Sequence, residues 1–195
     1  MLGFAAAVFF LIITPGPGVL STAGVGAGFG FRSGSQYVGG LFLGSNLVAF
    51  IVVSGLGALI LADPRVRTLL FAVSFCYLTY LALRIAFAGA RLAFIERARP
   101  PGVLGGVILQ IFNPKAYAVN TALFTGFAFL PEDYMTEVGL KFLVMNAIWL
   151  PIHFVWLWVG VTLHRLDLSP RVHRAINICM AISMIIVVVL AVVLQ

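Results

Sequence analysis

Two short segments interrupt otherwise apolar stretches of the chain: TPGPG at residues 14–18 and NPK at residues 113–115. Proline lacks a backbone N–H and clashes with the preceding helical turn, and glycine adds backbone freedom, so each segment predicts a helix break. The helix that ends at a break presents carbonyls that suit a cation, and the next helix presents N–H groups that suit an anion. Both ends together suit a small zwitterion. We expect an α-amino acid to be bound by Thr14, Pro15, Gly16, Pro17, Gly18, Asn113, Pro114 and Lys115.

Two ionisable side chains belong to this candidate site. Lys115 follows the second break, where a cation is unfavourable for the helix dipole unless an anion binds there. His153 lies within an apolar stretch, titrates near neutral pH and is our candidate for proton coupling. A neutral histidine that is hydrogen-bonded to a neighbouring helix is the alternative.

Amide side chains extend the site. Asn46 and Asn146 lie 100 residues apart, and we include both among the substrate-binding residues. They either line the cavity or join helices by hydrogen bonds. Asn120 and Thr121, about one turn after the second break, are weaker candidates.

The sequence offers little for metal or covalent chemistry. Cys76 and Cys179 each lie alone in an apolar stretch, so neither a disulfide framework nor a metal site is predicted. A membrane enzyme needs convergent catalytic groups, and only Lys115 and His153 are ionisable deep within apolar stretches. We therefore predict no metal, no cofactor and no enzymatic activity.

Composition determines where these segments lie. Apolar residues make up 62% of the chain and charged residues only 9%, against about 25% charged residues in soluble chains. So few charges cannot cover a soluble surface, and we predict an integral membrane protein surrounded by a lipid bilayer. The net charge of +6 comes from basic residues between apolar stretches, where they determine topology, so we predict no nucleic-acid partner.

Six apolar stretches are long enough to cross a bilayer, which takes about 18 residues: residues 2–29, 37–62, 66–90, 103–130, 142–163 and 176–194. We predict an all-α protein with one transmembrane domain over residues 1–195, in which the first and fourth helices are broken. Pro15 and Pro114 lie 99 residues apart, so residues 1–98 and 99–195 form two three-helix repeats. An odd number of helices inverts the second repeat. Chance spacing of six similar helices is the alternative.

The depth of the breaks follows from counting residues. About twelve residues precede Thr14 in the first span and about ten precede Asn113 in the fourth, which at ~1.5 Å per residue gives ~15–18 Å. Both breaks then lie near the middle of a bilayer core about 30 Å thick. The alternative is that the fourth span begins near Leu109, so that Lys115 reaches the interface.

Basic residues predict the orientation. Eight of them lie in the loops after the first, third and fifth spans, against Arg65, Arg67 and Lys141 on the other side. Basic loops face the cytoplasm, so both termini are expected outside. No basic residue precedes the first apolar stretch, so we expect it to be retained rather than cleaved as a signal peptide. The eight are Arg32, Arg84, Arg91, Arg97, Arg99, Arg165, Arg171 and Arg174.

Over essentially its whole length the chain resembles the LysE-type translocator family, on TPGPG, the continuation GAGFGFRSG and, later, FNPKAY. The resemblance implies an inner-membrane exporter of amino acids driven by the proton-motive force. Gly18 and Asn46 stand where the family often has Asp or Asn and an acidic residue, respectively, and no acidic residue lies deep in a span. A neutral amino acid is therefore expected. Export of another small solute, a metal ion or an organic anion, is the alternative, and a homo-oligomer remains open.

Overall fold

The structure, a computed structural model, describes residues 1–57, 63–86 and 99–165 and eight separate positions between residues 171 and 186. Within these residues the regular secondary structure is entirely helical, which confirms the predicted all-α class. Two helices, α2 (Pro17–Val53) and α7 (Tyr134–Arg165), are long and apolar enough to cross a membrane. Large apolar side chains such as Leu104 and Leu143 point outward, where lipid rather than water suits them.

The first predicted break separates α1 (Leu2–Ile13) from α2. Pro17 takes the first helical position of α2, where its missing N–H costs nothing. Gly16 before it is fully extended, with φ −167° and ψ 177°. The chain therefore leaves one helix and enters the next over three residues, at the position that TPGPG predicts.

A second irregularity divides α2 itself. Gly30 has φ 77° and ψ −178°, a conformation essentially restricted to glycine, and it separates helical parts over residues 17–29 and 31–53. The first part ends where the first predicted span ends. The second part starts six residues before the second predicted span and stops at Val53, where Gly55 turns the chain with φ 81°. Residues 58–62 of that span lie outside the described residues.

The second predicted break separates α5 (Gly102–Phe112) from α6 (Pro114–Thr125). Asn113 stands between them, and its side-chain oxygen accepts a hydrogen bond of 3.1 Å from the Lys115 N–H. α6 ends at Thr125, with Gly126 as its C-cap, whereas the apolar stretch continues to residue 130. The helix stops because the N–H groups of Phe129 and Leu130 instead donate to the Glu137 carboxylate.

The helix α7 begins at residue 134, although hydropathy predicted a span from residue 142. Asp133 accepts a hydrogen bond from the Thr136 N–H and caps the first turn. Glu137 and Lys141 form an ion pair of 2.7 Å in which both side chains are buried. A hydropathy count excludes these charges from a span, whereas the fold pairs them inside the helix bundle.

The remaining predicted spans are described only in part. α4 covers Pro64–Ala86 and matches the third predicted span up to residue 86. Residues 87–98, which include the rest of that span, lie outside the described residues, and so does most of the sixth predicted span, residues 176–194.

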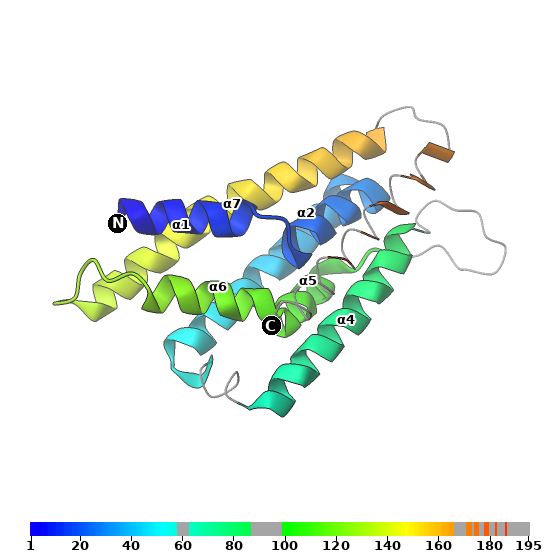
Figure 1. Cartoon of the computed structure of the whole chain (residues 1–195). Coiled ribbons are helices and arrows are strands. Elements are labelled where there is room, and N and C mark those ends of the chain that lie inside the picture. Colours follow the sequence, from blue (N-terminus) through cyan, green and yellow to red (C-terminus); the bar gives the residue numbers. More distant parts are fainter. Residues whose placement is uncertain are drawn as a thin grey trace.

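Close helix packing positions the breaks, and α2 contacts α5, α6 and α7 in the middle of the bundle (Figure 1). A Cβ atom on Gly40 would lie 1.9 Å from the carbonyl oxygen of Val103 in α5. One on Gly160 of α7 would lie 2.1 Å from the carbonyl oxygen of Ala23 in α2. These glycines let the backbones touch, as is common in membrane helix pairs.

The described loops and helix ends lie at the two ends of the bundle. In Figure 1 the N-terminus and the loop between α6 and α7 lie at one end, together with the end of α2. The turn within α2, the end of α4, the start of α5 and the end of α7 lie at the other end.

Candidate functional site

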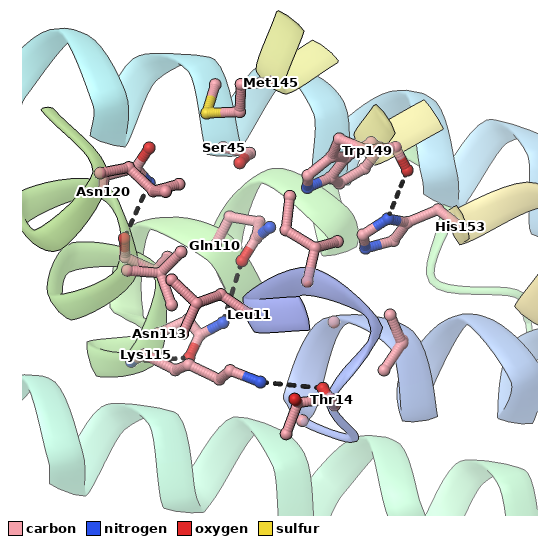
Figure 2. Close-up of a pocket in the computed structure, with 17 residues that line it drawn as sticks. Leu11, Thr14, Ser45, Gln110, Asn113, Lys115, Asn120, Met145, Trp149 and His153 are labelled. Carbon is pink, nitrogen blue, oxygen red and sulfur yellow. Dashed lines mark hydrogen bonds between the residues drawn. The ribbon is translucent and has the colours of Figure 1, made fainter. Parts of the chain in front are cut away.

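A partly open cavity lies where the two helix breaks meet. Residues of α1, α2, α5, α6, α7 and both breaks surround it (Figure 2). The lining comprises Leu11, Ile12, Thr14, Gly16, Gly18, Val19, Ser45, Gln110, Asn113, Lys115, Ala116, Val119, Asn120, Leu123, Met145, Trp149 and His153.

A lysine connects the two breaks directly. The Lys115 Nζ donates a hydrogen bond of 2.9 Å to the carbonyl oxygen of Thr14 at the end of α1 (Figure 2). The cation thus complements the negative end of α1, although Lys115 itself lies in the first turn of α6. A Cβ atom on Gly16 would come within 2.9 Å of Nζ, so the absent side chain leaves space for this contact.

The two helices that start after the breaks differ in whether a side chain caps their N-terminus. At α6, the Asn113 side chain already accepts from the Lys115 N–H. At α2, no side chain caps the helix, and Pro17 has no N–H to offer. Gly18 and Val19 line the cavity, so the N–H groups at the start of α2 form the uncapped, positive helix end at this site.

His153 stacks on Trp149 at one side of the cavity, with ring centroids 3.5 Å apart and planes inclined by 13°. Its Nδ1 lies 2.9 Å from the carbonyl oxygen of Trp149. A carbonyl only accepts, so Nδ1 carries a hydrogen and the other nitrogen, Nε2, is the acceptor of the neutral ring. A Cβ atom on Gly18 would lie 3.4 Å from Nε2, which places this nitrogen beside the first break.

Polar residues of α5 and α6 continue the lining. Gln110 and Asn113 are buried, and the Asn113 Nδ2 donates to the Gln110 Oε1 over 3.0 Å. Asn120 is also buried, and its Nδ2 donates to the carbonyl oxygen of Ala116 over 2.7 Å. No described group bonds to the Asn120 Oδ1.

The structure places the other predicted residues outside the lining. Asn46 and Asn146 exchange two hydrogen bonds, with donor–acceptor distances of 3.1 and 2.8 Å, and join α2 to α7. This arrangement corresponds to the helix-joining alternative. Pro15, Pro17 and Pro114 shape the breaks but do not line the cavity.

Among the polar and aromatic lining residues, three were not predicted from sequence: Ser45, Gln110 and Trp149. Gln110 lies one turn before Asn113, so the helical period could have identified it. Ser45 precedes Asn46, and one step along a helix turns a side chain by about 100°. That rotation, which the sequence does not orient, puts Ser45 rather than Asn46 in the lining.

The charge and shape of the lining limit what it can hold. Among the described residues that line the cavity, Lys115 and His153 are ionisable and none is Asp or Glu. No group of three or more His, Cys, Asp or Glu side chains gathers within the described part of the chain. Leu11, Leu123 and Met145 add apolar surface. The site therefore offers one cation, an uncapped helix start, amides and an apolar wall, which suit a carboxylate attached to an apolar group.

The family model described as "LysE type translocator" matches residues 9–195. A leucine efflux protein of Enterobacter sp. (strain 638) is 24% identical over 159 residues, which cover 79% of this chain and 74% of the relative. An uncharacterized membrane protein of Pseudomonas aeruginosa is 28% identical over 154 residues, or 74% of this chain and 70% of the relative. No solved structure matches the chain significantly.

Proposed function

The chain belongs to the LysE type translocator family, and on that premise we propose that it exports a small neutral amino acid, leucine or one of similar size. The family match makes it a membrane transporter rather than an enzyme. The relative named as a leucine efflux protein supports this substrate class. The observation that carries the proposal is the contact of Lys115 with Thr14, because it joins both breaks at one cavity.

The substrate carboxylate binds between the start of α2 and Lys115. The uncapped N–H groups of Gly18 and Val19 and the Lys115 ammonium supply the positive charge. An apolar substrate side chain packs against Leu123 and Met145. The cationic side chain of lysine or arginine finds no carboxylate among the described lining residues, so a neutral substrate is favoured.

The proposed architecture is six spans in two inverted repeats, 1–98 and 99–195. Exchange of the repeats converts α1 into α5, the first part of α2 into α6, and the second part of α2 into α7. The packed pairs support this exchange, because α1 packs on α7 as α5 packs on α2, and α6 packs on α2 as α2 packs on α7. Asn46 and Asn146, which correspond under the exchange, bond to each other.

Both breaks lie near the membrane midplane in this proposal. α1 has 12 residues and α5 has 11, and these lengths correspond to ~16–18 Å of helix before each break. The loop between α6 and α7 and the N-terminus face outward, and the ends that carry Arg32 and Arg99 face the cytoplasm. Backbone released from a helix at this depth has to be buried or to line a watery cavity, which fits a transport site.

The proton-motive force drives export, with His153 as the proton-binding residue. The Nε2 of this side chain lies beside the first break, and the ring is buried within the cavity lining. Protonation there places a second positive charge near Lys115 and beside the proposed carboxylate site. The affinity for the substrate carboxylate is thereby coupled to the proton.

Transport by purified protein in liposomes tests the function. We expect leucine and similar neutral amino acids to move faster when a pH gradient is imposed, while lysine moves little. Replacement of His153 by Gln is expected to leave leucine exchange between the two sides intact and to abolish acceleration by the gradient. Failure of every amino acid in the panel would contradict the proposal.

A small organic anion is the second candidate substrate. Lys115 has no acidic partner among the described lining residues, and a cation without a counter-charge favours an anion. Monocarboxylates without an amino group therefore belong in the same panel. Transport of these acids without transport of amino acids would favour the second candidate.

A further inference from the structure

One buried oxygen in the cavity lining has no partner among the described groups. Asn120 is only 3% exposed, and its Oδ1 forms no hydrogen bond there. A buried carbonyl oxygen without a partner destabilises the state that contains it. Ser35 and Thr79 also carry such oxygens, but neither lines the cavity.

The identity of the free atom is determined by the other half of the amide. One amide atom of Asn120 lies 2.7 Å from the carbonyl oxygen of Ala116, which only accepts, so that atom is the nitrogen. The free atom is therefore the oxygen. Figure 2 shows it turned away from this bond, toward the side of the cavity with Ser45 and Met145. It can accept a hydrogen bond but cannot donate one.

Several carbonyls at the helix ends already have donors. The Thr14 carbonyl accepts from the Lys115 Nζ, and the Phe10 carbonyl accepts from the backbone N–H and hydroxyl of Thr14. In α5, the Gln110 carbonyl accepts from the Asn113 N–H, and the Gln110 Oε1 accepts from the Asn113 side chain. Among the side-chain oxygens of the lining, the Asn120 Oδ1 is the buried acceptor that no described donor reaches.

We infer that the Asn120 Oδ1 accepts a hydrogen bond from the α-ammonium group of the transported amino acid, while Lys115 contacts the carboxylate on the same carbon. The inference rests on the proposed function and adds a specificity residue to it. Both residues line the cavity, and Asn120 lies five positions after Lys115 in α6, an axial rise of about 7.5 Å. Because Oδ1 is shielded from solvent, the contact forms in a state of the helices in which this oxygen is open to the cavity.

Three related probes test the ammonium contact. Leucine has both the amino group and the carboxylate, 4-methylpentanoate lacks the amino group, and 3-methylbutylamine lacks the carboxylate. Binding to the full-length protein in detergent is measured by calorimetry. Wild-type protein is expected to bind leucine more tightly than 4-methylpentanoate. Asn120→Leu is expected to weaken leucine binding about tenfold or more and to leave 4-methylpentanoate binding unchanged, because a hydrogen bond to a charged group is lost.

Two further variants provide the controls. Asn120→Asp keeps an acceptor and is expected to retain the preference for leucine, and unchanged 4-methylpentanoate binding by Asn120→Leu excludes a general folding defect in that variant. Ser35→Ala removes a buried, unpartnered hydroxyl outside the cavity and is expected to change neither affinity. If Asn120→Leu keeps the wild-type ratio of the leucine and 4-methylpentanoate affinities, or weakens the binding of both ligands equally, Asn120 does not bind the ammonium group and the inference is wrong.

The amine separates this inference from the proposed function. If wild-type protein binds neither leucine nor 4-methylpentanoate, the proposed function fails. Binding of 3-methylbutylamine then decides the role of Asn120: loss of amine binding in Asn120→Leu supports the ammonium contact, and unchanged or absent binding overturns it.

Discussion

At the scale of single residues, the site depends on glycine at position 16, because the absence of a side chain there leaves room for Lys115. Gly16 adopts an extended backbone that any residue can adopt, so its conformation does not require glycine. What requires glycine is the space beside it, which the end of the Lys115 side chain occupies. The usual explanation of glycine in a break, backbone freedom, is therefore not the reason for glycine at this position.

Replacement of Gly16 by Ala is expected to impair transport without unfolding the protein. The added methyl group would lie 2.9 Å from the Lys115 Nζ, and the flexible lysine is expected to move away from Thr14. We expect a loss of leucine affinity of about tenfold, since one charge-assisted hydrogen bond is worth ~1.5–3 kcal/mol. Calorimetric binding measures this loss.

A matched glycine provides the control for that experiment. A Cβ atom on Gly139 in α7 would meet nothing within 4 Å, so Gly139→Ala is expected to leave binding unchanged. Unaltered leucine affinity in Gly16→Ala would show that the position of Lys115 does not affect binding.

At the scale of elements, glycines let α2 and α5 pack more closely than residues with side chains would allow. Gly106 of α5 faces the backbone of α2 near Tyr37 and Leu41, and Gly40 of α2 faces Val103. The backbone of each helix therefore contacts a glycine of the other. This packing fixes the second break against α2 and thereby brings Gln110 to the cavity.

Gly40→Ala is expected to destabilise the protein by about 1–3 kcal/mol, because the new methyl group meets the rigid backbone of α5. The adjacent Gly39 has nothing within 4 Å of a Cβ atom, and Gly39→Ala is expected to be neutral or stabilising, as alanine favours helices by up to ~1 kcal/mol. Thermal unfolding in detergent compares the two variants. Equal melting temperatures would contradict the close packing of α2 and α5.

The ion pair at the start of α7 is a second feature of the elements. Glu137 accepts from two N–H groups of the loop after α6, and the Lys141 Nζ donates to the Phe124 carbonyl oxygen over 3.0 Å. The pair thus fastens α7 to the end of α6.

Lys141→Met is expected to destabilise the protein, because it leaves the Glu137 carboxylate without its cation and removes the bond to the Phe124 carbonyl oxygen. The double variant Glu137→Gln with Lys141→Met removes both charges and is expected to recover most of that loss. Chemical denaturation in detergent measures both. A single variant as stable as the wild-type protein would show that the pair contributes little.

At the scale of the whole molecule, the proposed inverted repeat pairs Asn46 with Asn146, which lie 100 residues apart and bond to each other. Such a repeat predicts that the two ends of the bundle face opposite sides of the membrane.

Cysteine labelling tests that orientation in a protein from which Cys76 and Cys179 have been replaced by Ser. Glu132→Cys is expected to react with an impermeant maleimide in intact spheroplasts, because positive-inside reasoning places its loop outside. Arg99→Cys, which is also exposed, is expected to react only after the membrane is opened. The reverse pattern would invert the proposed topology and place both termini in the cytoplasm.

Both helix breaks were predictable from sequence, because proline and glycine act on the backbone locally. Helix ends were less predictable. The start of α7 was placed at residue 142 because Glu137 and Lys141 count as polar in a hydropathy window, and only their pairing makes them tolerable inside the bundle. That Ser45 rather than Asn46 lines the cavity was not predictable for a different reason, since the rotation of a helix about its axis depends on its neighbours.

The sequence by itself determined that this is an all-helical membrane protein with breaks at TPGPG and NPK, because composition and backbone sterics are local properties. It also carried the motifs that identify the family. Only the tertiary structure decided that Lys115 reaches Thr14, that Asn46 and Asn146 join helices, and that Gln110, Ser45 and Trp149 line the cavity. Those contacts depend on how closely glycines let α2, α5 and α7 approach, which is a property of helix pairs rather than of any one segment.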